Sequence, residues 1–274
     1  MSNTSSSNVL PKYACPPVAE VAMGVHFPAL SAFGLAHLGL FAQRAKERGY
    51  PRLEQHPPIP FRREPLAGGF TPPQIGFRLS GKPEVPRTWF LDEAGNHVIQ
   101  VQQDMYLHNW RRVTDTDKYP SFENVRDSFV TCWADFRIFL GDYAMEAVPD
   151  QCQLTYVNQA PKGNGWESPA DWAKLFTAFN WQPKSGFLPS PECVGWFLTW
   201  PLEQNMGRLY MELAPAATKD NQPVLRWEFT ARGQPVEPTD EGIAGWYEVA
   251  HRWIVKAFAD LNTEKADALW SRQQ

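Results

Sequence analysis

Polar and apolar residues alternate along residues 98–109 with the two-residue period of a β-strand. The apolar side of this predicted strand carries Ile99, Val101, Met105 and Leu107. The other side carries hydrogen-bonding side chains, namely Gln100, Gln102, Asp104, Tyr106 and His108. Antiparallel sheets commonly have one solvated face, but an idle surface more often carries Lys, Glu and Thr. The polar side therefore indicates either a plain solvated face or a binding face.

Similar periods predict further strands in both halves of the chain. In the first half we expect strands over residues 16–27, 75–79, 87–92 and 97–109. In the second half we expect strands over residues 152–161, 193–200, 207–213 and 224–231. The sequence DEAGN at residues 92–96 predicts a tight hairpin turn, and the prolines and glycines of residues 51–75 predict a long loop.

Apolar residues at helical spacing predict helices over residues 31–48, 122–140, 168–179 and 240–261. Ser121 and Thr239 are suitable N-cap residues, and Ser168 followed by Pro169 is a further start signal. Gly49 and Gly141 are expected to end the first two helices.

Both halves thus follow the order strand, helix, three strands, helix. We expect an α+β fold with a disordered N-terminus at residues 1–15 and two β-α-β-β-β-α units, at residues 16–143 and 150–274. Two such units can join into one curved antiparallel sheet with helices on one face. In element order this arrangement resembles the saddle of the TATA-binding-protein-like fold. A helix-grip fold, in which the sheet wraps around the C-terminal helix, is the alternative.

A second polar row follows the predicted strands of the second half. Its members are Thr155, Thr199, Arg208, Tyr210, Glu212, Arg226, Glu228 and Thr230. In a continuous sheet, opposed Arg and Glu side chains can simply pair with each other, which is a structural use. The alternative is that this row extends the binding face of the first half.

Composition narrows the classes of partner. The chain has 274 residues, of which 43% are apolar, so a sizeable core is expected. A formal net charge of −4 provides no global field that would attract nucleic acid or an anionic membrane, and we expect neither as a partner. The sequence contains no apolar run of about 20 residues, and MSNTSSSN at its start lacks the features of a secretion signal. We therefore expect a cytoplasmic location.

Common catalytic motifs are missing from the sequence, including the phosphate loop, the dinucleotide fingerprint, Gly-x-Ser-x-Gly and His-Glu-x-x-His. The 4 cysteines and 6 histidines show no ligand-like spacing, so we expect no metal and no cofactor. Asp104 and His108 on one strand would lie about 13 Å apart, too far for a direct acid–base pair. The sequence thus favours a non-enzymatic protein.

The strand over residues 97–109 leads directly into Trp110, Arg111 and Arg112. Trp and Arg are enriched at the energetic centres of protein interfaces. The alternative is that Trp110 packs in the core and the arginines pair with Asp115 or Asp117.

Several stretches resemble an uncharacterised, sporadically distributed bacterial protein family of similar length. They are PPVAEVAMGVHF, HVIQVQQDMYLHNWRR, YPSFENV, LTYVNQ and HRWIVKAFADLN, and the resemblance spans nearly the whole chain. It implies a bacterial, cytosolic accessory protein and transfers no catalytic residue. Sporadic distribution is typical of horizontally transferred genes, including those for defence, antitoxin or immunity functions.

Together these observations predict a non-catalytic binding protein that engages a protein partner through its open sheet face. The expected binding residues are Gln100, Gln102, Asp104, Tyr106, His108, Trp110, Arg111 and Arg112. The alternative is a small-molecule-binding protein or an enzyme with a polar pocket on the sheet.

Overall fold

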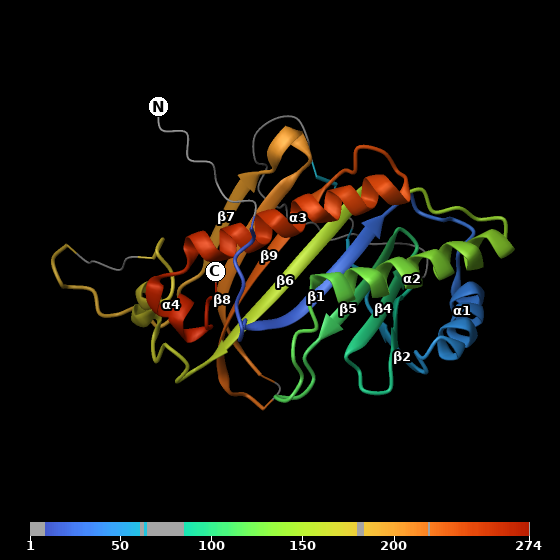
Figure 1. Cartoon of the computed structure of the whole chain (residues 1–274). Coiled ribbons are helices and arrows are strands. Elements are labelled where there is room, and N and C mark those ends of the chain that lie inside the picture. Colours follow the sequence, from blue (N-terminus) through green and yellow to red (C-terminus); the bar gives the residue numbers. More distant parts are fainter. Residues whose placement is uncertain (1–8, 61–62, 65–84, 180–183, 219, 274) are drawn as a thin grey trace.

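The computed structural model describes residues 9–60, 63–64, 85–179, 184–218 and 220–273. Its centre is one open, nine-stranded antiparallel sheet with the order β2-β3-β4-β5-β1-β6-β9-β8-β7 (Figure 1). The first half contributes β1 (Val18–His26), β2 (Arg52–His56), β3 (Arg87–Leu91), β4 (His97–Gln102) and β5 (Met105–Arg111). The second half contributes β6 (Gln151–Pro161), β7 (Trp196–Pro201), β8 (Arg208–Ala217) and β9 (Pro223–Gly233). The α+β class and the antiparallel sheet are confirmed.

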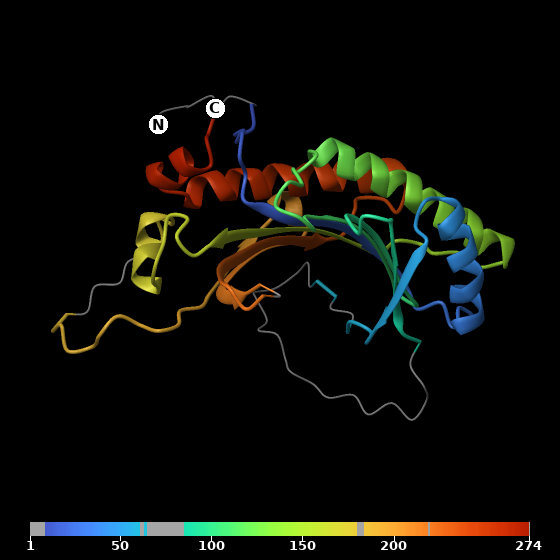
Figure 2. The ribbon, with the colours of Figure 1, turned by 90° about the horizontal axis from the view of Figure 1, so that it is seen from below.

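Two long helices, α2 (Phe122–Asp142) and α3 (Asp240–Leu261), cover one face of the sheet (Figures 1 and 2). The predicted starts are confirmed, because Ser121 Oγ accepts from Asn124 N at 3.3 Å and Thr239 Oγ1 accepts from Gly242 N at 3.1 Å. The shorter helices are α1 (Leu35–Glu47) and α4 (Glu264–Leu269). Gly141 lies inside α2 instead of ending it.

The helix predicted at residues 168–179 is a short 3₁₀ helix, Pro169–Lys174. Its start is as predicted, since Asp171 accepts from the backbone N–H of Ser168 at 3.0 Å. The apolar residues beyond it still enter the core, and Phe176 meets Trp227 of β9 with 5.4 Å between ring centroids. The apolar spacing therefore reflected burial and not a continuing helix.

Aromatic side chains fill the layer between the sheet and the two long helices. Tyr106 of β5 stacks on Phe136 of α2 with 5.0 Å between ring centroids. Phe129 of α2 meets Tyr247 of α3 edge to face at 5.2 Å, which joins the two helices. The Tyr247 hydroxyl also donates to the carbonyl of Gly24 in β1 at 2.7 Å. Because aromatic residues bury large apolar areas, this layer is the main core.

The prediction of one strand over residues 97–109 is wrong. β4 ends at Gln102, a turn follows at Gln103 and Asp104, and β5 begins with Met105, which pairs with Gln102. The turn contains no Gly, Pro or Asn-Gly pair, which are the usual sequence signals for a hairpin. Since the turn takes two residues, the side chains after it alternate in the opposite phase to the one expected.

Other elements also depart from the expected pattern. β2 lies within residues 51–75, which were predicted to be loop, and the strand predicted at residues 75–79 lies outside the described residues. The first half therefore has one strand more than the second half among the residues described. The hairpin at residues 92–96 is confirmed by the antiparallel pairing of β3 with β4.

The sheet curves so that the face turned away from α2 and α3 is concave (Figure 2). Ile59 and Glu64, which follow β2 in the chain, contact side chains on this side. Within the described part of the chain the edge strands β2 and β7 do not pair, and the sheet does not enclose α3 as the helix-grip alternative requires. Among the described residues of the first-half loop, Ile59 and Glu64 form hydrogen bonds on the concave face.

Residues 12–15 fall within the segment that the sequence predicts to be disordered. They run beside the C-terminal end of the chain, where Ala14 N donates to the Ser271 carbonyl at 3.0 Å. The Tyr13 hydroxyl donates to Asp267 Oδ1 at 2.8 Å. Among the residues described, no helix combines the length and apolar character that crossing a membrane requires.

Candidate functional site

The predicted site residues are divided between the two faces of the sheet. Directly paired residues share a face, and Gln102 pairs with Met105. Gln100 and Gln102 therefore point to the concave face, whereas Tyr106 and His108 point toward the helices. The prediction that these side chains form one polar row is wrong.

The residues on the helix side of β5 belong to the core. Tyr106 is 0% exposed beneath α2, and His108 is equally buried. Trp110 packs against Tyr119 with 5.6 Å between ring centroids, in agreement with the alternative interpretation that it is a core residue. None of the three is accessible to a partner in the folded chain.

The remaining predicted residues lie at the ends of the hairpin. Asp104 lies in the turn between β4 and β5, where its Oδ1 accepts from Gln102 Nε2 at 2.7 Å. Arg111, at the end of β5, places its guanidinium 5.5 Å from the centroid of the Trp89 ring. Arg112 follows β5 directly. The eight predicted residues therefore do not form one surface.

The polar row predicted for the second half does lie on one face, the concave one. Tyr210 pairs directly with Thr199 on one side and with Thr230 on the other. Arg226 and Glu228 form an ion pair at 2.6 Å, but both belong to β9, so this pair does not join neighbouring strands as the sequence suggested; Glu228 directly opposes Glu212 of β8. The concave face is thus polar across β9 and β8 as well.

A ladder of side-chain hydrogen bonds connects β3, β4, β5 and β1 on the concave face. Arg87 Nη1 donates to Gln100 Oε1 at 3.0 Å, and Gln100 Nε2 donates to Asn109 Oδ1 at 3.1 Å. Asn109 in turn donates to the carboxylate of Glu20. Burial raises the pKa of Glu20, while the hydrogen bond from Asn109 lowers it. Both polar groups of the Gln100 amide form hydrogen bonds with side chains of adjacent strands, which favours a structural role for this residue.

Gln102 makes a different kind of contact, with the backbone of the segment that follows β2. Its Oε1 accepts from Ile59 N at 2.8 Å, and its Nε2 donates to the Ile59 carbonyl at 2.9 Å. One amide side chain therefore satisfies both polar groups of one residue, as a neighbouring strand would do. Such a contact depends on the backbone and not on the side chain that is bound.

A second anchor lies five residues further along the same segment. The backbone N–H of Glu64 donates to Gln151 Oε1 at 2.7 Å. The Glu64 carboxylate is held through both oxygens, by Arg208 Nη1 at 2.5 Å and by the Tyr210 hydroxyl at 2.5 Å. Glu64 is only 3% exposed and Arg208 8%. We call Gln151, Arg208 and Tyr210 the carboxylate pocket.

The two anchors are aligned across the sheet. Four residues in register form a straight row over β4, β5, β1 and β6, namely Gln102, Met105, His26 and Gln151. Three strand spacings separate Gln102 from Gln151, or about 14 Å. A step of five residues can span up to roughly 16 Å, which is long enough to reach from one anchor to the other.

The surroundings of the carboxylate pocket are positive. Arg232 lies beside it, with Nε donating to Gln153 Oε1 at 3.1 Å and the guanidinium 5.6 Å from the Tyr210 ring. Burial and the charge of Arg232 lower the pKa of His26 to about 4, so this imidazole is neutral at physiological pH. Burial, and then the hydrogen bond to Glu64, raise the pKa of Tyr210, so its hydroxyl remains a donor.

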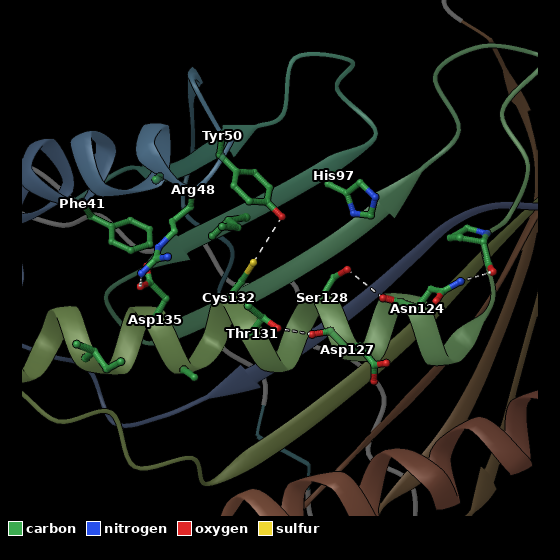
Figure 3. A pocket seen from close by; sticks show the side chains of 15 residues that line it. Phe41, Arg48, Tyr50, His97, Asn124, Asp127, Ser128, Thr131, Cys132 and Asp135 are labelled. Atoms are coloured by element: carbon green, nitrogen blue, oxygen red, sulfur yellow. Dashed lines mark hydrogen bonds and ion pairs between the residues drawn. The ribbon is translucent and has the colours of Figure 1, made fainter.

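A separate cleft of about 810 Å³ lies on the helix side, between the end of α1, the outer side of α2 and β4 (Figure 3). The Tyr50 hydroxyl points into the space toward Cys132, with 3.5 Å between the oxygen and Sγ. The same hydroxyl lies 3.1 Å from His108 Nε2. Arg48 and Asp135 form an ion pair at 3.0 Å at one end of the cleft.

Two groups beside this cleft, the His108 imidazole and the Cys132 thiol, are neutral at physiological pH. Burial, and then the nearby His97, lower the pKa of His108 to about 3. Burial also raises the pKa of the Cys132 thiol, so the thiolate that a nucleophile requires is disfavoured. Nδ1 of His97 and of His108 have no partner within the described part of the chain. The arrangement can bind hydrogen-bonding groups, and the Cys132 thiol in it is not activated as a nucleophile.

In the described ranges, no group of three or more His, Cys, Asp or Glu side chains is arranged to hold a metal ion. Comparisons with protein-family models, curated proteins and solved structures gave no match. The sites are therefore defined by their geometry. Sequence reasoning missed Ile59 and Glu64, because they lie in a segment with no periodic pattern. Arg208 and Tyr210 were placed on the correct face, but nothing in the sequence connects them with Glu64.

Proposed function

We propose that this chain is a non-catalytic binding protein that engages a protein partner through its concave face, by holding an extended segment of that partner. The observation that carries this proposal is the pair of hydrogen bonds from the Gln102 amide to the N–H and the carbonyl of Ile59. Because the Gln102 side chain contacts only main-chain atoms of the bound segment, the contact accommodates an extended peptide of another sequence. Gln151 provides a second main-chain contact across the sheet.

The contacts with residues 59 and 64 serve as the internal example of such binding. A partner segment would make the same contacts by taking the place of this part of the chain. Since a tethered segment competes at a high effective concentration, a free peptide binds the wild-type chain more weakly than the contacts alone would indicate. The resemblance to a sporadically distributed bacterial family adds defence, antitoxin or immunity as the proposed setting.

A selection from a random-peptide library on the full-length protein tests this proposal. Selected peptides are expected to bind the wild-type chain and the Gln43→Ala variant alike, because Gln43 is an exposed glutamine of α1 on the other side of the sheet. Their affinity for Gln102→Ala should fall at least tenfold. Equal affinity for all three chains, or no peptide that binds, would contradict the proposal.

The cleft on the helix side supports a second candidate function, the binding of a small neutral molecule. The specific observation is the pair of buried Nδ1 atoms of His97 and His108, which lack a partner in the described part of the chain, beside about 810 Å³ of space. A fragment screen by NMR should then give shifts at Tyr50 and Cys132. Shifts confined to the concave face would count against this candidate.

We also propose that the two halves are related units of a TATA-binding-protein-like saddle. The order of strands supports this, because β1 and β6, the first strands of the halves, pair at the centre and are flanked by β5 and β9, the last strands. A crystal structure in which β1 and α2 superpose on β6 and α3 would agree with it. A different crossing of α2 and α3 over their strands would contradict it.

A further inference from the structure

The carboxylate pocket provides a separate donor for each oxygen of the group it holds. Arg208 contacts Oε1 of Glu64 and Tyr210 contacts Oε2, while Gln151 holds the backbone N–H of the same residue. We infer that the partner's segment carries an acidic side chain at this position, five residues after the residue held by Gln102. This inference rests on the proposed function and specifies the chemistry of its ligand.

Charge is the first reason that the pocket selects a carboxylate. Arg208 is almost completely buried, and a buried guanidinium without an opposite charge is strongly unfavourable. Arg232 adds a second positive charge nearby, and the neutral His26 adds none. Asp150, which precedes Gln151, is paired with Arg63 of the segment that a partner would displace. A carboxylate on the incoming peptide therefore supplies the negative charge that Glu64 places beside Arg208.

Hydrogen-bond geometry is the second reason. Hydrogen bonds that join charged groups are shorter and about twice as strong as those between neutral groups. The corresponding amide, glutamine, has one acceptor oxygen and an NH₂ group, which is a donor. Facing Arg208, that NH₂ group would meet a side chain that only donates, and facing Tyr210 it would turn the hydroxyl from donor to acceptor. A glutamine therefore loses both charge-assisted hydrogen bonds and brings no negative charge to Arg208.

The spacing of the two anchors indicates that they act on one ligand. Gln102 and Gln151 occupy the same row across β4, β5, β1 and β6, and the carboxylate pocket includes Gln151. The ligand that fits is thus an extended acidic peptide lying across the strands. Its main chain is bound at both anchors, and its sequence is restricted at the acidic position.

Peptide binding to the full-length Glu64→Ala chain tests this inference, because that substitution removes the internal carboxylate. The probe is a synthetic peptide with the sequence of residues 57–64, PPIPFRRE, acetylated and amidated so that the glutamate side chain is its only carboxylate. The control peptide, PPIPFRRQ, differs by one group. We expect the glutamate peptide to bind at least tenfold more tightly than the glutamine peptide in isothermal titration calorimetry.

Two double variants test whether Tyr210 itself causes the preference for glutamate. In Glu64→Ala with Tyr210→Phe, the preference for glutamate over glutamine should shrink at least threefold, whereas in Glu64→Ala with Tyr143→Phe it should be unchanged. Tyr143 is a half-exposed residue after α2, outside the pocket. Thermal melts of all chains confirm that each is folded.

The possible failures are distinguishable. Equal affinity of the glutamate and glutamine peptides overturns the inference while leaving main-chain binding on the concave face intact. Binding of neither peptide to any chain overturns the proposed function together with the inference. A preference for glutamate that survives Tyr210→Phe unchanged would assign the carboxylate to another part of the surface and likewise overturn it.

Discussion

The hydroxyl of Tyr50 lies 3.1 Å from Nε2 of His108, and this contact is buried beneath the cleft beside α2. The same oxygen lies 3.5 Å from Sγ of Cys132, so one hydroxyl connects the strand layer with the helix layer. Removing it leaves a buried imidazole nitrogen without its partner, which costs more than the loss of an exposed hydrogen bond.

Tyr50→Phe is therefore expected to lower the free energy of unfolding by about 1–2 kcal/mol. The matched control is Tyr143→Phe, because the hydroxyl of the half-exposed Tyr143 has no hydrogen bond to any residue that the structure describes, and the change in the free energy of unfolding should be within about 0.5 kcal/mol. Urea unfolding at pH 7 measures both. Equal effects of the two substitutions would show that the Tyr50–His108 contact contributes nothing.

His108 should make the stability of the chain depend on pH. Burial, and then His97, lower its pKa to about 3 in the folded chain, against 6.5 for an ordinary histidine. Between these values the unfolded chain binds more protons, so this contribution is complete above about pH 6.5 and is lost as the pH falls. Each pH unit costs up to about 1.4 kcal/mol, or about 2–3 kcal/mol between pH 6.5 and 4.5.

The comparison with His108→Gln isolates this effect. His26 and His251, whose pKa values are also lowered to about 4 by burial, titrate in both chains. The free energy of unfolding of His108→Gln should thus fall less steeply with decreasing pH than that of the wild type. Urea titrations at pH 6.5, 5.5 and 4.5 measure both chains. If the two free energies of unfolding fall in parallel, burial does not lower the pKa of His108.

The sequence predicted those parts of the fold that depend on local chemistry. Ser121 and Thr239 cap the helices that they were expected to cap, and the hairpin at residues 92–96 forms because its turn has the usual composition. The turn at Gln103 and Asp104 has no such signal. One missed turn reversed the phase of all side chains that follow it, which moved Tyr106 and His108 from the expected binding face into the core.

The candidate site could not be predicted because it depends on contacts that are distant in the sequence. Gln102 was assigned to a polar face for a local reason, its alternation with Val101, and that face is the one it occupies. Its partner, Ile59, is 43 residues away, and Glu64 is 144 residues from Arg208. Local periodicity contains no information on such pairs. Only the order of strands brings them together.

Tyr106 provides a direct test of the changed assignment. An exposed binding residue could be truncated without loss of stability, but Tyr106 is fully buried against Phe136 and Trp133. Tyr106→Ala should lower the free energy of unfolding by about 3–5 kcal/mol. Tyr106→Phe should leave it unchanged or raise it slightly, because the hydroxyl is buried with no partner among the residues described. A well-folded Tyr106→Ala chain in thermal melts would argue for the exposed position after all.

The contact between Glu64 and Tyr210 can be measured in the wild-type chain without any ligand. Hydrogen bonds to charged groups contribute about 1.5–3 kcal/mol. Tyr210→Phe should therefore lower the free energy of unfolding of the wild type but leave that of the Glu64→Ala chain nearly unchanged. The coupling energy of this double-mutant cycle should therefore be at least about 1 kcal/mol. A parallel cycle of Glu64→Ala with Tyr13→Phe, whose hydroxyl donates to Asp267, should give less than about 0.5 kcal/mol. If the Tyr210 cycle gives as little as the Tyr13 cycle, Glu64 does not occupy the carboxylate pocket in solution, and the internal example of peptide binding on the concave face is lost with it.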